Sequence, residues 1–196
     1  AVMKKAEEPD LPVGVGKGST EFAYKKELNR LKAIRKELPQ SSKYQGIDGF
    51  GNPVGNVAYS TSEIRNYNIP DLKSYSKIGS LGKNGIKNPV DGWVSNVDNP
   101  RYSNLVEKVD RNNQISPNGT LRINDTEYKI IENYNRILSG DSAASGTINI
   151  FSERKICPSC EKVIKAFSND YPNIEINVMD SFGNLYTVLG GQKLIK

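Results

Sequence analysis

The two cysteines of this chain are the residues whose type and spacing could carry chemistry. Cys157 and Cys160 enclose a Pro-Ser pair, and the 196-residue sequence has no other cysteine and no histidine. The apolar spacing after them predicts a helix that begins at this pair, where unpaired backbone N–H groups and the helix dipole stabilise thiolates. Such a pair is compatible with a redox dithiol, half of a metal site or a structural pair.

A metal site would need a further ligand. Catalytic zinc takes three protein ligands and a water, so without histidine the third ligand from this chain must be a carboxylate. Asp125 and Glu127 open a predicted helix, and Glu127 belongs to the same stripe as Ile130 and Ile131. A carboxylate on an apolar stripe is costly unless it is used or paired. Acidic residues in a first helical turn are also ordinary caps, so both interpretations stay open.

The elements that must position these residues alternate between helix and strand. Residue spacing predicts a helix at 124–138, a strand at 147–151, a helix from Cys157 to about Tyr171, and two strands at 174–179 and 185–189 joined by a short turn. This order predicts an α/β domain with a mixed sheet, flanking helices and a C-terminal β-hairpin whose strands are antiparallel. We expect residues 125–189 to form the core around the candidate metal site.

The first 40 residues are predicted to be a linker followed by a cationic amphipathic helix. Pro and Gly interrupt residues 1–20, and apolar residues then recur at mostly helical spacing as far as Leu38. The basic face of this helix could be an ordinary solvated face, or it could contact nucleic acid. The remainder, residues 41–196, is expected to be one catalytic domain.

Residues 41–124 are harder to interpret. A β-hairpin is expected over residues 44–60, with its bend at Gly51–Val54, followed by a loop-rich insertion over residues 60–124. Aromatic and basic side chains alternate in the insertion, where they could stack on and neutralise a single-stranded nucleic acid or serve as packing anchors. They are Tyr75, Lys77, Lys83, Lys87, Trp93, Arg101 and Tyr102.

Charge and hydropathy exclude some classes of protein. The net charge of +5 favours contact with polyanions, although acidic and basic residues are interspersed. No apolar run approaches the roughly 20 residues of a membrane helix, and no secretory signal pattern is present. Because the sequence begins with Ala1, it could be a piece of a larger protein.

The combined motifs resemble the zinc-dependent cytidine/deoxycytidylate deaminase-like superfamily. There one helix opens with His-x-Glu, and after a strand the next helix opens with Pro-Cys-x-x-Cys. Over residues 120–180 the chain is similar to the divergent toxin deaminases of bacterial polymorphic toxins. The matching residues are Ser152-Glu153, Cys157-Pro-Ser-Cys160, Val163-Ile164, Phe167 and Tyr171-Pro-Asn-Ile174. Two residues depart from the pattern: Asp125 replaces the histidine, and Ile156 replaces the proline.

The resemblance implies a fold and a set of roles. The fold would be the three-layer cytidine-deaminase-like fold, and the cofactor would be Zn²⁺ held by Asp125, Cys157 and Cys160. Glu127 would be the catalytic residue that shuttles protons. Substrate-binding residues would be Asn56, Ser76 and Glu153.

The implied activity is that of a deaminase toxin. It would convert cytosine to uracil in DNA or RNA, through Glu127-assisted attack of zinc-bound hydroxide on C4. Free nucleotides or adenine could be the substrate instead, and a thiol–disulfide protein or an inactive binding module remain alternatives. The expected partners are a nucleic acid or nucleotide, a cognate immunity protein and N-terminal delivery domains, with action in the cytoplasm of a target cell and no membrane association.

Overall fold

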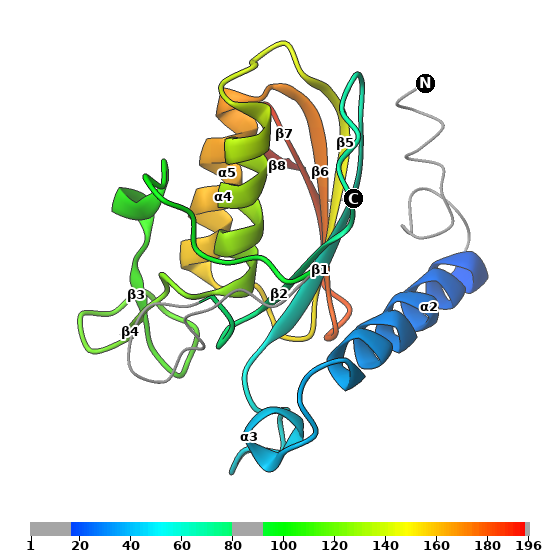
Figure 1. The fold of residues 1–196 in the computed structure, drawn as a ribbon, viewed down its shortest axis with the longest axis vertical. Coiled ribbons are helices and arrows are strands. Elements are labelled where there is room, and N and C mark those ends of the chain that lie inside the picture. Colours follow the sequence, from blue (N-terminus) through cyan, green and yellow to red (C-terminus); the bar gives the residue numbers. More distant parts are fainter. Residues whose placement is uncertain (1–16, 80–91, 195–196) are drawn as a thin grey trace.

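The computed structural model describes residues 17–79 and 92–194, with side chains from Tyr24 onward in the first helix. In this part of the chain a six-stranded sheet has the order β2-β1-β5-β6-β7-β8 (Figure 1). The strands are β1 (Val57–Ile64), β2 (Leu72–Tyr75), β5 (Ser145–Ser152), β6 (Asn173–Asp180), β7 (Leu185–Leu189) and β8 (Gln192–Leu194). Strands β5 and β6 are parallel and the other neighbours are antiparallel, which confirms the predicted mixed sheet.

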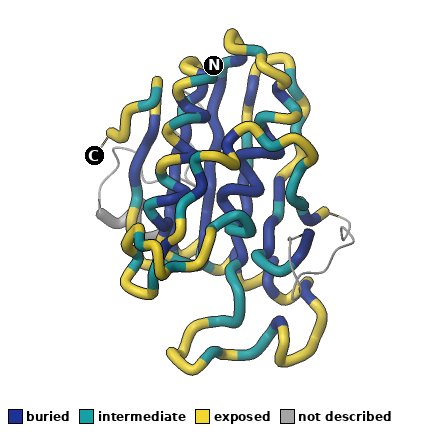
Figure 2. Tube along the Cα trace, turned by 90° about the vertical axis from the view of Figure 1, so that its left-hand side faces the viewer, coloured by how far each residue is buried: buried dark blue, intermediate teal, exposed yellow. Residues whose placement is uncertain are grey.

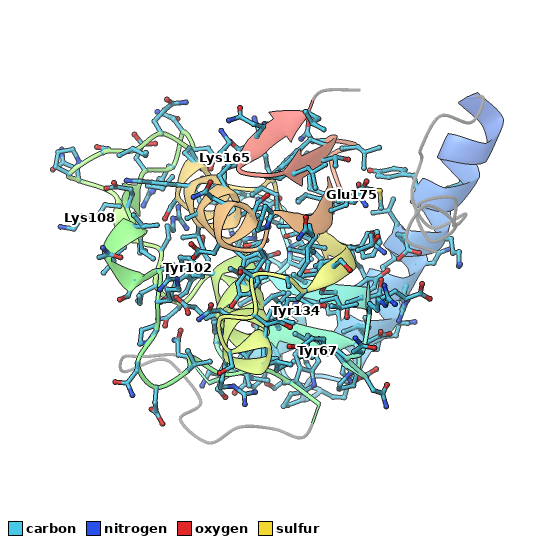
Figure 3. The ribbon with its side chains drawn as sticks, turned by 90° about the horizontal axis from the view of Figure 1, so that it is seen from above. Tyr67, Tyr102, Lys108, Tyr134, Lys165 and Glu175 are labelled. Carbon is cyan, nitrogen blue, oxygen red and sulfur yellow. The ribbon has the colours of Figure 1, made fainter. Side chains whose placement is uncertain are left out.

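Helices cover both faces of this sheet. Helices α4 (Thr126–Leu138) and α5 (Pro158–Asp170) lie side by side on one face, and α2 (Lys17–Lys36) lies against the other. Seen from above, the strands stand between α2 and the α4–α5 pair (Figure 3). The predicted three-layer α/β architecture is therefore confirmed, together with its antiparallel C-terminal strands. None of the described helices is both long and apolar enough to cross a membrane.

The larger core lies between the sheet and the α4–α5 pair. The helical stripe predicted from the sequence is buried there, with Ile130, Ile131 and Tyr134 all at 0 % exposure. Strand β5 is buried along almost its whole length because helices cover both of its faces (Figure 2). This continuous burial holds the end of β5 in place, and Cys157 follows five residues later at the start of α5.

A second core lies beneath α2. Leu31 and Ile34 of this helix pack with Tyr59 and Phe151 of the sheet, whose rings stack with centroids 4.8 Å apart. The apolar face of α2 is therefore a packing face. The guanidinium of Arg30 lies 4.5 Å from the Tyr59 ring centroid. A basic residue of α2 therefore also contacts the sheet.

The N-terminal part of the domain differs from its prediction. The β-hairpin expected over residues 44–60 is reduced to one antiparallel bridge between Ile47 and Pro53, and it is preceded by α3 (Ser42–Gln45), a single helical turn. The strand that follows, β1, pairs instead with β2 and β5. Strand β5 is distant in sequence, so local alternation could not identify it as a partner.

Residues 60–124 contain more structure than a loop-rich insertion. They include the end of β1, all of β2, a 3-10 turn η1 (Ser103–Leu105), and a two-stranded sheet of β3 (Lys108–Val109) and β4 (Thr120–Leu121). Tyr75, Trp93 and Tyr102 are buried, as expected of packing anchors rather than of a surface that binds nucleic acid. Lys83 and Lys87 lie outside the described residues.

Candidate metal and catalytic site

The cysteine pair begins helix α5. Cys157 is the residue that caps the helix, Pro158 occupies its first turn, and the Cys160 N–H donates to Cys157 Sγ at 3.4 Å. Proline suits this position because its missing N–H would have no helical partner there. Both thiols are thereby held on one side of the helix start, where both residues are buried.

Asp125 stands at the start of helix α4 but does not act as its cap. Its side chain makes no capping hydrogen bond. Instead, Asp125 Oδ2 lies 3.3 Å from Cys157 Sγ and 3.5 Å from Cys160 Sγ. The ordinary capping interpretation therefore does not describe this carboxylate, which faces the two thiols.

These three side chains fit a tetrahedral zinc ion. Their potential ligand atoms all lie within 4.8 Å of one another. Zinc ligands at about 2.0–2.3 Å from the metal stand about 3.3–3.8 Å apart in a tetrahedron, which the two Asp125–cysteine distances of 3.3 and 3.5 Å match. Two thiolates and a carboxylate are also a donor set that zinc favours, with a fourth position left for water.

Crowded acidic groups give this site its electrostatic character. Burial raises the pKa of Asp125, and burial together with the Asp125 carboxylate raises the pKa of Glu127. The hydrogen bond with Cys157, followed by burial, raises the pKa of the Cys160 thiol well above its usual value. Negative charge is therefore costly here without a cation, and a divalent metal would relieve that cost.

Glu127 lies beside the potential metal ligands. Its side chain is buried at 3 % exposure, and Cys160 Sγ is 3.6 Å from Glu127 Oε2. The other oxygen, Oε1, accepts a hydrogen bond from Asn56 Nδ2 at 3.2 Å. This carboxylate is thus fixed between the cysteine pair and an amide donor.

Asn56 and Ser76 lie together near Glu127. The Asn56 N–H donates to Ser76 Oγ at 3.0 Å, and the Ser76 N–H donates to Asn56 O at 3.0 Å. The Asn56 amide also reaches Thr126 Oγ1 at 2.7 Å and Ser152 Oγ at 3.1 Å. Asn56 therefore positions Glu127. Asn56 and Ser76, two of the three predicted substrate-binding residues, line the cavity described next.

A cavity of about 610 Å³ opens in front of Glu127. It lies within the size range of small-molecule sites, and Asp125, Glu127 and Cys157 contribute to its wall. The remaining lining residues are Asp48, Phe50, Asn52, Gly55, Asn56, Ser76, Asp110, Arg111, Asn113, Arg122, Arg154, Lys155 and Phe182. The buried Glu127 carboxylate therefore lies at the wall of a cavity large enough for a small molecule.

Glu153, the third predicted substrate-binding residue, does not line this cavity, and neither does Cys160. Its oxygens accept from Arg35 Nε and Nη2, both at 2.6 Å, and Oε2 also accepts the Val57 N–H at 3.0 Å. Arg35 in turn donates to Tyr44 O at 2.7 Å and Val54 O at 3.1 Å. Together with Arg35, Glu153 ties α2 to the loop that carries Asn56.

Replacing Glu153 with alanine should lower the free energy of unfolding by about 3–5 kcal/mol. The Arg35 and Glu153 side chains are only 10 % and 13 % exposed, and removing one partner strands a buried charge. Urea unfolding followed by tryptophan fluorescence measures the loss. The paired variant Arg35→Met with Glu153→Leu should recover most of it, whereas a loss below about 1 kcal/mol for Glu153→Ala would contradict a buried bridge.

Lys129 is a structural residue of the site that the sequence reasoning missed. It is fully buried, and its Nζ donates to Tyr75 O at 2.6 Å and Ile78 O at 2.7 Å. Burial lowers the pKa of Lys129 to about 7. These bonds hold the segment that carries Ser76 against α4. The available signal was its spacing, four residues from both Asp125 and the buried Asn133 on one helical face.

Comparison with known proteins gives a family for most of this chain. Residues 31–182 match the Toxin-deaminase family model, described as the BURPS668_1122 family of deaminases. Neither the curated proteins nor the solved structures include a match. The matched range contains Asp125, Glu127 and both cysteines, so it includes the whole site described above.

Proposed function

This chain belongs to the Toxin-deaminase family, and on that premise we propose that it is a zinc-dependent deaminase that converts cytosine to uracil in nucleic acid, either DNA or RNA. One observation carries the proposal: Asp125, Cys157 and Cys160 converge within 4.8 Å, with the buried Glu127 carboxylate beside them. A deaminase needs such a pairing, because water must be activated and its proton carried to the leaving ammonia.

Each of these side chains has a defined task in the proposed reaction. Zinc held by Asp125, Cys157 and Cys160 would act as a Lewis acid that lowers the pKa of water. The water could then lose a proton at neutral pH and attack the ring carbon. Glu127 takes the proton at Oε2, the oxygen beside Cys160, and returns it to the amino group that leaves as ammonia. Asn56 keeps the carboxylate oriented by donating to Oε1. Water and cytosine are consumed, and uracil and ammonia are formed.

Aspartate in place of histidine makes Glu127 more important. Two thiolates and a carboxylate give a zinc centre a formal charge of −1, compared with zero when neutral histidine replaces the carboxylate. A more negative centre is a weaker Lewis acid, so its water is less acidic. More of the proton transfer then depends on Glu127, whose burial and raised pKa suit a proton carrier.

A thiol–disulfide function is less consistent with the geometry. A reactive cysteine is accessible and has a lowered pKa. Cys160 is 1 % exposed and its pKa is raised, which weakens it as a nucleophile. The carboxylate of Asp125 against both sulfurs also disfavours thiolates in the absence of a cation.

The family is consistent with a delivered toxin, and the biological setting that we propose is built on it. As a delivered toxin, the protein would act in the cytoplasm of a target cell after transport by N-terminal domains of a larger polypeptide. A cognate immunity protein would protect the producing cell. The net charge of +5 and the basic residues around the cavity, including Arg111, Arg154 and Lys155, favour a nucleic acid over an uncharged substrate.

Expression in a bacterium that lacks uracil glycosylase tests the proposal. We expect C-to-T changes in DNA or C-to-U changes in RNA above the background of an empty vector, and background levels for Glu127→Ala. Sequencing both nucleic acids measures this. Equal numbers of changes with the wild type and Glu127→Ala would contradict the proposed role of Glu127, and no change with either would exclude nucleic acid as the substrate.

A further inference from the structure

Two segments that flank the cavity share one five-residue pattern. Residues 48–52 read Asp-Gly-Phe-Gly-Asn, and residues 180–184 read Asp-Ser-Phe-Gly-Asn. The first segment precedes β1 and the second joins β6 to β7. The pattern places phenylalanine at the third position of both segments.

The two segments also form the same turn. Asp48 Oδ1 accepts the N–H groups of Phe50 and Asn52 at 2.9 and 3.0 Å. Asp180 Oδ1 accepts those of Phe182 and Asn184 at 2.9 and 3.1 Å. The glycine after each phenylalanine has a positive φ, +81° and +84°, a conformation that favours glycine. Both turns therefore fix the backbone that carries the phenylalanine. The same turn occurs at residues 110–114, where Asn112 takes the third position.

Both phenylalanine rings are directed into solvent at the cavity. Phe50 is 76 % exposed and Phe182 is 66 % exposed, and both line the cavity. By contrast, Phe151 and Phe167 are buried at 1 % and 0 %. An exposed ring forgoes about 1.5–3 kcal/mol of burial, so two such rings at one cavity indicate a surface that something covers.

Sheet topology brings the two turns to opposite sides of the site. Strand β5 lies between β1 and β6, and Ser152 at its end pairs with Ala58 of β1 and Asp180 of β6. The Phe50 turn leads into β1, whereas the Phe182 turn follows β6. Both occur at the lower end of the sheet in Figure 1, where β5 continues into the segment that carries the cysteines.

The second turn is held firmly against this segment. The Ser181 N–H donates to Ser152 O at 2.9 Å, and the Ser181 hydroxyl donates to Glu153 O. The Tyr24 hydroxyl of α2 also donates to Ser181 O. Phe182 is consequently an exposed ring on a fixed support, which suits a stacking platform because little conformational entropy is lost on binding.

Basic side chains line the same cavity as the two rings. The Arg111 guanidinium lies 6.0 Å from the Phe50 ring centroid, and Arg154 and the exposed Lys155 line the same cavity. Lys77 is near enough to Lys43 and Arg154 that their charges add to the effect of burial and lower its pKa. Of the nearby acids, Asp48 forms an ion pair with Arg154 at 3.5 Å, and Asp110 accepts backbone hydrogen bonds within its own turn. Several separate cations suit a chain of phosphates better than one terminal phosphate.

We propose that the substrate is a single-stranded nucleic acid whose bases on either side of the target cytosine stack on Phe50 and Phe182. This inference rests on the proposed function, since it places the target base in the cavity before Glu127. Stacking on aromatic side chains is how proteins hold single strands without regard to sequence. A free nucleotide has no neighbouring bases to offer, and in a duplex those bases are already stacked.

Binding to a protein that cannot turn substrate over provides the test. In a Glu127→Ala background, fluorescence anisotropy would measure the Kd for a short labelled DNA or RNA strand with one central cytosine. Phe50→Ala and Phe182→Ala should each weaken binding about 5- to 150-fold, the effect of losing one stacked base. Phe50→Trp and Phe182→Trp should retain the affinity for the single strand, because tryptophan can also stack on a base. The fully paired duplex and free CMP or dCMP should bind more weakly than the single strand. For CMP or dCMP, the two alanine variants should have the same Kd as their Glu127→Ala parent.

Controls separate this inference from the proposed function. Leu194→Ala removes another exposed apolar side chain, 43 % exposed on β8, and should leave strand binding unchanged. Alanine variants that bind the strand as well as their parent, or a duplex bound as tightly as the strand, would overturn the inference. If the otherwise wild-type enzyme deaminates nothing while the alanine variants still weaken strand binding, the proposed function fails and the stacking platforms stand.

Discussion

Replacing Glu127 with glutamine should lower kcat for cytosine deamination by about 10²–10⁴-fold, the usual contribution of a positioned proton carrier. Glutamine has nearly the same shape and can still accept the Asn56 amide donor at its Oε1. It cannot take a proton from water or return one to ammonia. The effect should therefore appear in kcat, whereas KM and the affinity for nucleic acid should change little.

A second buried glutamate on the same helix provides a matched control. Glu132 is 1 % exposed, and its carboxylate accepts the N–H groups of Arg101 and Tyr102 at 3.0 and 2.6 Å, away from the cavity. Glu132→Gln should reduce stability but leave kcat within about twofold, since it touches no reacting group. Zinc content should stay the same in both variants. A Glu127→Gln enzyme that keeps more than about a tenth of the wild-type kcat would fall short of the 10²-fold minimum and remove Glu127 from the mechanism.

The parts of the fold that were predictable are those with strong local periodicity. The stripe of Ile130, Ile131 and Tyr134 predicts a helix because these positions repeat at helical spacing, and α4 has that stripe buried. Strands β6 and β7 were predictable because a short turn joins them. Pairing of β1 with β5 joins residues about 90 positions apart, and no local pattern encodes such a partner.

The site, like the fold, has residues that could be predicted from the sequence and residues that could not. Asp125 could be selected as the third ligand because the chain lacks histidine, and the structure brings its carboxylate to both thiols. Glu153 matches the resemblance described above, but its partner in the structure is Arg35 of α2, a contact between residues 118 positions apart. The repeated turns at Phe50 and Phe182 are visible in the sequence, yet only the order of the strands shows that they flank one cavity.

Cysteine-to-serine substitution at either position of the pair should remove the metal and, with it, the activity. Losing a partner that merely orients a ligand costs 10- to 100-fold in metal affinity, so losing a ligand should cost more than about 100-fold. Wild-type protein should contain about one zinc per chain, and Cys157→Ser or Cys160→Ser close to none after dialysis. Elemental analysis and competition with a chromogenic chelator measure this independently of catalysis.

Asp125 allows a sharper version of the same test. Asp125→Ala should weaken zinc binding, whereas Asp125→His supplies another zinc ligand at the same helix start and should retain the metal. In the wild type, burial raises the pKa of Asp125, and the Cys157 contact raises that of Cys160, so both groups hold protons to a higher pH than usual. Zinc must displace those protons, and its affinity should therefore fall as the pH is lowered through their raised pKa values. Because histidine titrates near pH 6.5, Asp125→His should shift the pH range over which zinc affinity falls. If Asp125 had only a structural role, the substitution would leave that pH range unchanged.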